Sequence, residues 1–445
     1  MISARVGLVV CVLACLLSAC ATLTTPPAAP TAAQVLPILP AQQETAVVPP
    51  TQTIPSPTSI PATVTPLPPT ETSIPGPVIT LSQIHMLDTT NGWAWGPMPN
   101  TNDPTSTVYR LLRSADGGQT WLDVSPKPNS PGYYGGFFLN DQVAWIPYSD
   151  PTTYAVNLLR TLDGGKTWEA LPPNDILQMG QVQFTSPNDG ILETAGVGAG
   201  NKYLNYYDTH DGGASWKPIL LAAPNPEPGL PPGTIHLCNI CGDSLYYDPE
   251  RMVIVYGSMA NDPPSAVPVA ISTDMGQHWK NIKLPLPEGN KYVKGMVAPQ
   301  QAAFFGQTGI LPVNIMEYSS DGSVAYSVLT VYTSTDGGQN WTISPNLLET
   351  NSNFDTVQVI SGQIAFARCG KNLCATDDGA RTWQTLPNSL DFDMANGGPE
   401  YVGQFAFISR TEGWAIAGQD PNTNLWKTSN GGLTWVNIFP TLAGN

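Results

Sequence analysis

Four cysteines in the body of the chain have the residue type for disulfide, redox or metal chemistry: Cys238, Cys241, Cys369 and Cys374. Four cysteines permit three disulfide connectivities. We favour Cys238–Cys241 and Cys369–Cys374, because the second pair brackets a predicted hairpin loop at 370–373 that would place its two thiols opposite each other.

Zinc bound by Cys238, Cys241, His236 and a fourth group is the alternative use of these cysteines. It is less favoured because zinc ligand pairs usually lie on adjoining turns, whereas the two cysteine pairs lie in separate repeats of the chain. A thioredoxin-like redox role for Cys238 and Cys241 is weaker still, because no helix is expected there to lower a thiol pKa. No metal and no cofactor are therefore expected.

Acidic side chains recur in the longer predicted loops, mostly in an Asp-Pro setting: Asp103, Asp150, Asp262, Asp321 and Asp420, with Glu227 and Asp243 on or near a long insertion. A ring of such carboxylates could hold a basic partner or a calcium ion. Turn chemistry is the slightly favoured alternative, because Asp-Pro forms turns in its own right. The best adhesive aromatics nearby are Tyr133 and Tyr134, with Phe137 and Phe138, although half of these are equally expected in a strand core.

Catalytic motifs of other kinds find little support. The four histidines, His85, His210, His236 and His278, are scattered along the chain and suggest no Ser–His–Asp arrangement. No phosphate-cradling motif is evident. The sequence therefore argues against catalysis.

The element that must position these residues is a turn that recurs seven times. Its frame is Ser/Thr-x-Asp-x-Gly-x-Thr-Trp, here called the box, and it drifts at His278, Asn340, Ala380 and Asn430. Its Asp and Ser/Thr side chains can cap nearby backbone amides, Gly supplies an unusual backbone angle, and Trp buries a large ring. The defining pairs are Asp116 and Trp121, Asp163 and Trp168, Asp211 and Trp216, Asp274 and Trp279, Asp336 and Trp341, Asp378 and Trp383, and Asn430 and Trp435. We predict that every box Trp is buried.

With Gly92-Trp93-Ala94 before the first box and Gly413-Trp414-Ala415 before the last, the pattern resembles the BNR/Asp-box repeat of sialidases, sortilin-type receptors and photosystem II assembly factors. It is most similar to the photosystem II stability/assembly-factor-like family. The resemblance covers roughly residues 79 to 440. It implies a β-propeller but says little about function, since enzymes and non-enzymes share the box.

The box Trp spacings of 47, 48, 63, 62, 42 and 52 residues suit four-stranded blades. We therefore predict an all-β, single seven-bladed β-propeller over residues 78–445. Each blade reads as strand A, a short turn, strand B, a variable loop, strand C, the box and strand D. In the first blade these strands are expected at 83–87, 93–96, 108–113 and 121–124. Six or eight blades, and closure by residues 78–81, stay open.

Antiparallel order within a blade puts the A–B turns and the boxes on one side of the ring, the box face, and the B–C and D–A loops on the other, the loop face. The variable loops fall almost entirely on the loop face, where binding usually resides. Residues 97–107 are the first such B–C loop.

By the same resemblance, a sialidase-like site would need three arginines. Only Arg368, at the end of a strand B, is expected to reach the loop face. Xyloglucanase-like glycosidases use two such propellers, whereas this chain has one.

Residues 1–20 read as a bacterial lipoprotein signal peptide, with Arg5, an apolar run over 7–17, and Leu17-Ser18-Ala19-Cys20, so Cys20 is the expected lipidation site. An ordinary secretory signal is the alternative. Residues 21–77 hold 15 Pro and 12 Thr in 57 positions and read as a disordered, extended tether. The protein is thus expected to be extracytoplasmic, with the lipid as its only membrane anchor.

After loss of residues 1–20, 17 basic residues face 34 acidic ones, a net charge of −17. Such acidity disfavours nucleic acid and anionic membrane surfaces as partners. The predicted function is that of a monomeric, surface-anchored, non-catalytic propeller that docks or helps to assemble a protein partner. The chain lacks the arginine-rich patch that photosystem-binding relatives carry. The alternative is a carbohydrate-active propeller, either a sialidase-like glycoside hydrolase or a glycan-binding domain.

Overall fold

The computed structural model describes residues 76–100, 103–126, 135–149, 156–172, 180–198, 201–221, 243–257, 266–288, 295–318, 324–350, 357–387, 389–392, 401–419 and 422–443. The predicted signal peptide and nearly all of the predicted tether, with Cys20, lie outside the described residues, as do Cys238 and Cys241. Residues from Thr72 onward form one compact unit. Its described elements are all strands, and no helix suited to crossing a membrane occurs among them.

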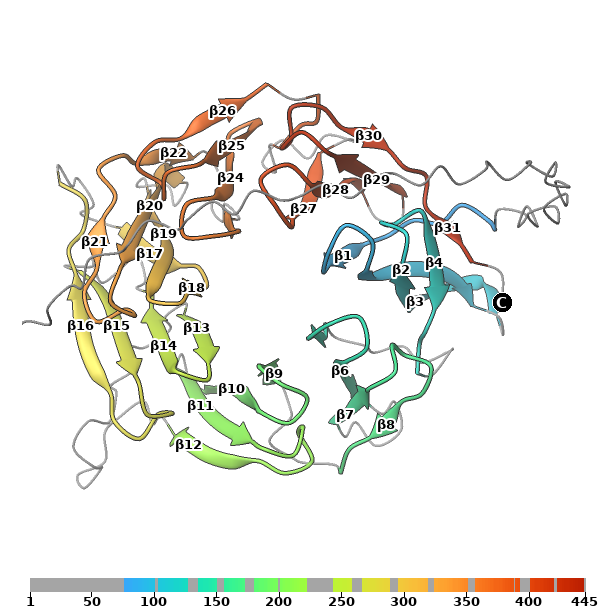
Figure 1. The fold of residues 1–445 in the computed structure, drawn as a ribbon, viewed down its shortest axis with the longest axis horizontal. Helices are drawn as coiled ribbons and strands as arrows, with labels where there is room; N and C mark the ends of the chain where they lie inside the picture. Colours follow the sequence, from blue (N-terminus) through green and yellow to red (C-terminus); the bar gives the residue numbers. More distant parts are fainter. Residues whose placement is uncertain are drawn as a thin grey trace, which may run out of the picture. The chain divides into compact units, whose positions relative to one another are not determined.

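The strands form seven sheets arranged as the blades of a ring (Figure 1), which confirms the predicted seven-bladed β-propeller. From the channel outwards, blade 1 holds β1 (Gln83–Met86), β2 (Gly92–Asn100), β3 (Asp103–Ser114) and β4 (Thr120–Asp123). Blade 2 holds β5 (Phe137–Phe138), β6 (Ala144–Ser149), β7 (Val156–Thr161) and β8 (Glu169–Ala170). Blade 3 holds β9 (Gly180–Phe184), β10 (Gly190–Gly198), β11 (Asn201–Thr209) and β12 (Lys217–Leu221). Blade 4 holds β13 (Asp243–Asp248), β14 (Arg251–Tyr256), β15 (Val267–Ser272) and β16 (Lys280–Leu284).

The remaining blades follow the same order. Blade 5 holds β17 (Gly295–Pro299) and β18 (Ala303–Phe305), both paired with β19 (Thr308–Tyr318), then β20 (Val324–Ser334), which pairs with β21 (Thr342–Ile343) and β22 (Leu348–Thr350). Blade 6 holds β23 (Val357–Val359), β24 (Ala365–Cys369), β25 (Asn372–Thr376) and β26 (Gln384–Leu386). Blade 7 holds β27 (Val402–Phe407), β28 (Gly413–Gln419), β29 (Asn422–Thr428) and β30 (Val436–Asn437).

The ring closes through its C-terminal segment. All four strands of blade 7 come from the C-terminal part of the chain, and β31 (Thr441–Leu442) then runs parallel to β4 as a fifth strand of blade 1. Val78 bridges Thr441, and the Thr423 hydroxyl donates to the Leu81 carbonyl at 2.6 Å. Residues 78–81 therefore line the junction of blades 7 and 1 without completing blade 7, which answers the question that the sequence left open.

The box turns are built as predicted. In the first box, the Ser114 hydroxyl accepts from Gly118 N at 2.9 Å and donates to Asp116 Oδ1 at 2.9 Å. The Asp116 carboxylate in turn accepts from the backbone and the hydroxyl of Thr120. The same bonds recur in every box, so each turn caps itself with side chains that lie within eight residues.

The drifted boxes keep this network. Ala380 does so through its backbone N–H, which donates to the Thr376 hydroxyl at 3.0 Å, and the other replacements supply an equivalent polar group. Asn340 Nδ2 donates to Asp336 Oδ2 at 2.7 Å, and the His278 ring nitrogen lies 2.6 Å from Asp274 Oδ2. In the seventh box, Asn430 accepts from Thr434 N at 3.0 Å and donates to the Thr434 hydroxyl at 2.8 Å. An amide therefore replaces the carboxylate without loss of the turn.

We predict that the box carboxylates make folding acid-sensitive. Hydrogen bonds from the Thr167 side chain and backbone lower the pKa of Asp163 from 3.8 to about 2, and the pKa values of Asp211 and Asp274 are also lowered to about 2. A lowered folded-state pKa stabilises the fold above the unfolded pKa, and this stabilisation is lost as pH falls through the folded value. The thermal midpoint should therefore fall between about pH 4 and about pH 2. The midpoint should fall less in the triple variant Asp163→Asn, Asp211→Asn, Asp274→Asn. Box seven is the natural precedent for these substitutions, because it holds Asn430 in place of the aspartate. Parallel curves for the two proteins would contradict this origin of the acid sensitivity.

The tryptophan pattern departs from the prediction. Trp121 and Trp435 are buried, but the other box tryptophans are only half-buried: Trp168, Trp216, Trp279, Trp341 and Trp383. The prediction that every box Trp is buried is therefore wrong. The reason is position, because the box leads into the outermost strand of its blade, where one side of the ring system meets solvent.

Apart from Trp121 of the first box, the fully buried tryptophans lie on the second strand of blades 1, 2 and 7. Trp93, Trp145 and Trp414 are each 0% exposed. Their indole N–H groups donate to carbonyls of the following blade: Asn140 at 3.1 Å, Gly212 at 2.9 Å and Gly117 at 3.0 Å, respectively. These side chains tie adjacent blades together.

Candidate interaction surface

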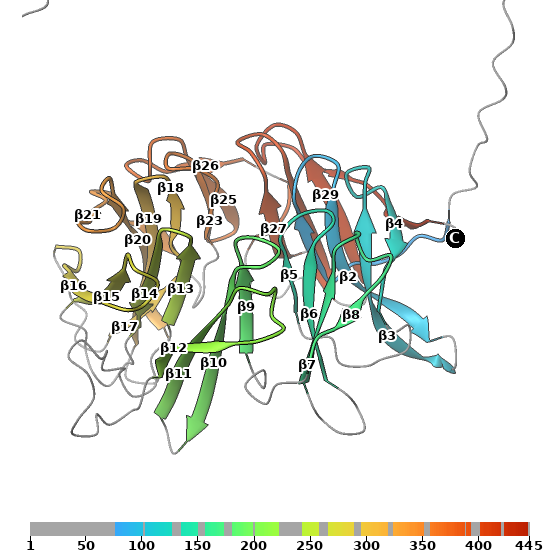
Figure 2. The same ribbon diagram turned by 60° about the horizontal axis from the view of Figure 1, so that its bottom comes forward.

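The two faces of the ring are separated as predicted. In six of the seven boxes a glycine N–H donates to a carbonyl of the A–B turn in the same blade, for example Gly117 to Thr90 and Gly212 to Asn188, both at 2.8 Å. The A–B turns and these boxes therefore share the box face. Figure 2 shows the β2–β3 and β10–β11 hairpins projecting from the ring on the opposite side, the loop face.

The β2–β3 hairpin is much longer than predicted. Residues 97–107 were expected to be a loop, but β2 and β3 stay paired out to Asn100 and Asp103. Pro97 and Pro99 obscure this strand in the sequence. They are tolerated because β1 pairs only with Gly92–Trp95 of β2. Beyond Trp95 this edge of β2 is no longer paired with β1, and proline is accepted at an unpaired strand edge because it has no N–H to donate.

The structure describes two positions of the predicted carboxylate group, Asp103 and Asp243, and Asp243 begins β13. Asp103 begins β3 and pairs with Asn100 at the far end of the hairpin. The other predicted site residues lie outside the described residues: Asp150, Glu227, Asp262, Asp321, Asp420, Tyr133 and Tyr134. Of the neighbouring aromatics, Phe137 and Phe138 form β5 and pack against core rings, Phe138 stacking on Trp93 with centroids 5.2 Å apart.

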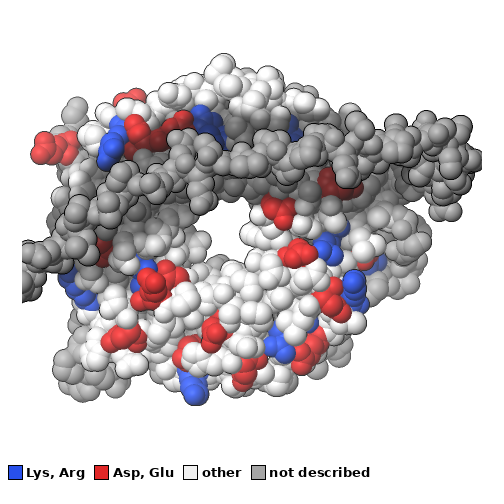
Figure 3. All heavy atoms as spheres, in the orientation of Figure 1, with Lys and Arg blue, Asp and Glu red and all other residues white. Residues whose placement is uncertain are grey.

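Many acidic side chains that the structure does describe belong to the box face, where they cap turns. Asp88 accepts from the backbone of Thr90 and Asn91, both at 2.7 Å, and the hydrogen bonds from Asn91 lower the pKa of Asp88. Asp189 accepts from Ser186 and contacts His210 Nδ1 at 2.8 Å. In Figure 3, acidic side chains are spread around the ring with fewer basic side chains among them. These box-face carboxylates therefore cap turns of the fold.

Arginines of the box face join one blade to the next. The guanidinium of Arg113 pairs with Asp141 at 3.0 Å, that of Arg160 donates to the Asp211 carbonyl at 3.2 Å, and that of Arg410 pairs with Asp377 at 2.5 Å. Arg251 likewise donates to the Gly306 carbonyl at 2.9 Å and pairs with Asp248. These four cations are committed to the fold.

Arg368, the predicted loop-face arginine, is also committed to the fold. Its side chain is 1% exposed and lies over the rings of Phe392 and Phe405. Its guanidinium donates to the carbonyls of Phe392 at 3.0 Å, Val402 at 2.6 Å and Gly403 at 3.0 Å. It anchors the chain that leads from blade 6 into blade 7, and no substrate carboxylate can reach it.

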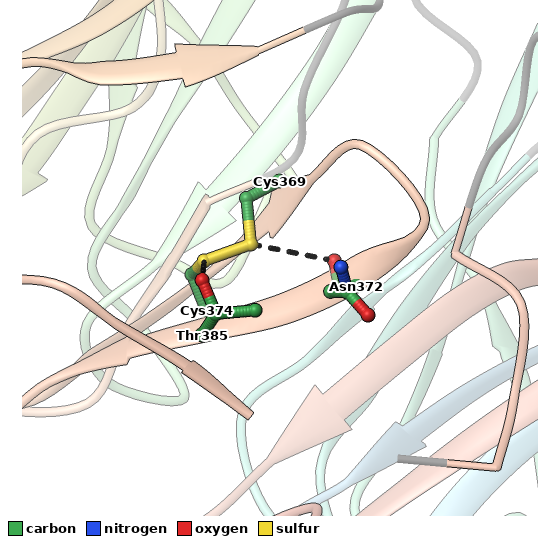
Figure 4. Close-up of a disulfide and its surroundings, with 4 residues drawn as sticks. All are labelled: Cys369, Asn372, Cys374 and Thr385. Carbon is green, nitrogen blue, oxygen red and sulfur yellow. Dashed lines mark hydrogen bonds between the residues drawn. A yellow bond between two sulfur atoms is a disulfide. The ribbon is translucent and has the colours of Figure 1, made fainter. Parts of the chain in front are cut away.

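One disulfide lies in the β24–β25 hairpin, directly after Arg368 in the sequence, and Figure 4 shows its two cysteines. Cys369 and Cys374 are bonded across the β24–β25 hairpin, with their Cα atoms 5.8 Å apart, in the pairing favoured from sequence. The turn between the strands is only Gly370–Lys371, and Gly370 adopts a φ of 63°. The bond therefore closes a short hairpin.

A cavity of about 180 Å³ opens in the channel wall at the junction of blades 7, 1 and 2. The side chains of Gln83, His85 and Gln404 line it, together with Trp95, Phe138 and the backbone of Gly135 and Gly136. His85 is exposed to the channel, yet the surrounding protein desolvates it and lowers its pKa. Sequence reasoning missed this cavity, although a glutamine near the end of several inner strands was a signal available for it.

The comparisons with known proteins give structural likeness alone. No family model and no curated protein matches the chain. Among solved structures, it is similar to YCF48 bound to a D1 peptide, with 18% identity and a TM-score of 0.43 over 80% of this chain and 94% of that one. It is also similar to a GH74 xyloglucanase from Xanthomonas campestris, with 15% identity and a TM-score of 0.48 over 82% of this chain and 55% of that one. An ulvan lyase shares 9% identity and a TM-score of 0.43 over 68% of this chain and 81% of that one. At these identities the similarities concern the fold alone.

Proposed function

We propose that this chain is a non-catalytic docking propeller that binds a protein partner on its loop face. The observation that carries the proposal is the asymmetry of the ring. The polar groups of the box face satisfy one another within turns and between blades, whereas the long β2–β3 and β10–β11 hairpins project from the loop face. Variable elements on a rigid scaffold are the usual place for binding.

The arginines support a non-catalytic function over a sialidase-like one. A sialidase-like site would need three guanidinium groups free to converge on a substrate carboxylate. Arg113, Arg160, Arg251, Arg368 and Arg410 are instead each bound to carboxylates or carbonyls of their own fold. Their charge is therefore used for blade-to-blade contacts.

The setting of the domain is part of the proposal. A lipid on Cys20 would anchor the chain outside the cytoplasm, and residues 21–77 would hold the propeller away from the membrane. A tethered domain gains local concentration for a partner at the same surface. We also propose, from the box motif, a family relationship to photosystem II assembly factors. This relationship concerns the docking role. It does not extend to photosystem binding itself, because the chain is acidic.

We predict that partner capture depends on loop-face carboxylates and weakens with salt. The quadruple variant Asp103→Asn, Asp150→Asn, Asp262→Asn, Asp420→Asn should recover several-fold less partner from an extracytoplasmic fraction, because exposed charges act by screened attraction. The matched control is Asp163→Asn, Asp211→Asn, Asp274→Asn, Asp378→Asn, which removes the same charge from the box face.

Equal recovery by the two quadruple variants would exclude the loop face as the docking site. A glycan array and a fluorogenic sialoside assay test the carbohydrate-active alternative. Tight sugar binding or cleavage there would overturn the docking proposal.

A further inference from the structure

Glutamines on the inner strands act as clasps between blades. Gln404 of β27 accepts from Ile84 N at 2.8 Å and donates to the Ile84 carbonyl at 2.8 Å. Gln358 of β23 does the same to Phe407, accepting at 2.6 Å and donating at 2.8 Å. Each carboxamide therefore pairs with both main-chain groups of one residue on the next blade's inner strand, as a neighbouring strand would.

Gln83 occupies in blade 1 the position that Gln404 occupies in blade 7. It lies three residues before Met86, which pairs with Gly92, just as Gln404 lies three residues before Phe407, which pairs with Gly413. The side chain of Gln83 is exposed, and it has no hydrogen-bond partner among the described residues. The clasp of blade 1 is thus present but open.

The space that a clasped strand would fill is the cavity in the channel wall. The inner strand of blade 2, β5, comprises only Phe137–Phe138 and is preceded by Gly135 and Gly136. A Cβ placed on Gly135 would meet no described residue within 4 Å, so there is space beside this glycine in the described part of blade 2. The cavity of about 180 Å³ lies between these glycines and Gln83.

The remaining walls suit an uncharged ligand. The His85 ring lies 5.5 Å from Phe138, which stacks on Trp93, and these rings give the cavity an aromatic wall. Desolvation lowers the pKa of His85 and favours its neutral form. The polar groups offered are then a carboxamide and a neutral imidazole.

We propose that this cavity binds one residue of an extended peptide segment, with the Gln83 carboxamide accepting from its main-chain N–H and donating to its carbonyl. The inference rests on the proposed docking function and names the chemistry of the partner. An extended residue presents its own N–H and C=O on the same side, as Ile84 and Phe407 do to their clasps. The N–H and C=O of an acetamido group on a sugar point in opposite directions, so one carboxamide cannot pair with both.

The test uses a blocked tripeptide, acetyl-Ala-Ala-Ala-amide, titrated into the full chain while the Gln side-chain amide signals are followed by NMR. We expect the Gln83 signal, assigned by its loss in Gln83→Leu, to shift. Gln83→Leu should weaken binding by about tenfold, the effect of losing a pair of hydrogen bonds. N-methylation of the central residue of the tripeptide removes its N–H alone and should separately weaken binding by about threefold to tenfold, the effect of losing one hydrogen bond. The matched control Gln181→Leu changes the same strand position in blade 3 and should leave the affinity unchanged.

Unfolding measurements separate an open clasp from a filled one. Gln404→Leu should lower the unfolding midpoint, whereas Gln83→Leu should leave it unchanged. An equal loss in both variants would mean that the chain itself fills the Gln83 clasp, and this would overturn the inference. Binding of N-acetylglucosamine as tight as that of the tripeptide would overturn it as well.

Partner capture distinguishes this inference from the docking proposal. Capture that responds to the loop-face carboxylates but not to Gln83→Leu would reject the cavity and leave the docking proposal standing. Tripeptide binding by a protein that captures no partner would reject the docking proposal and leave the cavity standing.

Discussion

Replacing Trp145 with alanine should lower the free energy of unfolding by about 3–5 kcal/mol, the range for deleting a large buried aromatic ring. The side chain is 0% exposed and stacks on Phe184 of blade 3 with centroids 3.6 Å apart. Its indole N–H donates to the Gly212 carbonyl at 2.9 Å. The substitution would therefore leave a void between blades 2 and 3 and an acceptor without its donor. Urea-induced unfolding measures the loss.

Trp168→Ala is the matched control for Trp145→Ala. Trp168 is a box tryptophan, only half-buried, with one hydrogen bond to the Val124 carbonyl at 2.8 Å. Because less apolar area is removed from contact, we expect a loss of about half that of Trp145→Ala. Equal losses in the two variants would show that the box tryptophans matter as much to stability as the inter-blade ones.

Replacing Arg368 with methionine should cost about 2–4 kcal/mol of unfolding free energy, because three carbonyls would lose a charged donor in a buried site. Methionine keeps an unbranched stem of similar shape, so the loss reports the hydrogen bonds more than the packing. Arg368→Lys should recover only part of the stability, since an ammonium group cannot reproduce the planar geometry of the guanidinium. Thermal and urea unfolding of the three proteins provide the comparison.

Arg410→Met is the control for the Arg368 series. Arg410 is partly exposed and forms an ion pair with Asp377, so its loss should cost under about 1 kcal/mol. A loss below about 1 kcal/mol in Arg368→Met as well would mean that water replaces the guanidinium at the three carbonyls. That outcome would remove the anchoring role of Arg368 between blades 6 and 7.

The box turns are the part of the fold that the sequence predicts best. Ser114, Asp116, Gly118 and Thr120 form a complete hydrogen-bond network within one turn, so residue types and spacing are enough to predict it. Seven such turns, with strands between them, then predict the number of blades and the face on which the boxes lie. The Cys369–Cys374 pairing was accessible for the same reason, because a short hairpin brings its two strands together locally.

Contacts between blades were decided by the tertiary structure. The boxes suggested that their own tryptophans are the buried ones, but Trp145 is buried because box three of the next blade lies over it, 67 residues along the chain. The sequence predicted that Arg368 reaches the loop face, but in the structure Phe392 and the carbonyls of β27 enclose its side chain. Pro97 and Pro99 looked like loop residues because the sequence does not show where β1 ends beside β2.

The sequence by itself therefore determined the repeating unit, its strand order and its two faces. The way in which the ring closes, the buried inter-blade side chains and the open clasp at Gln83 were determined only by tertiary structure. The Gln404 clasp joins residues 320 positions apart, and β31 joins β4 across a similar distance. The physical reason is the range of the interactions, because a turn satisfies its hydrogen bonds with its own neighbours, whereas a blade edge finds its partner only after the ring has closed.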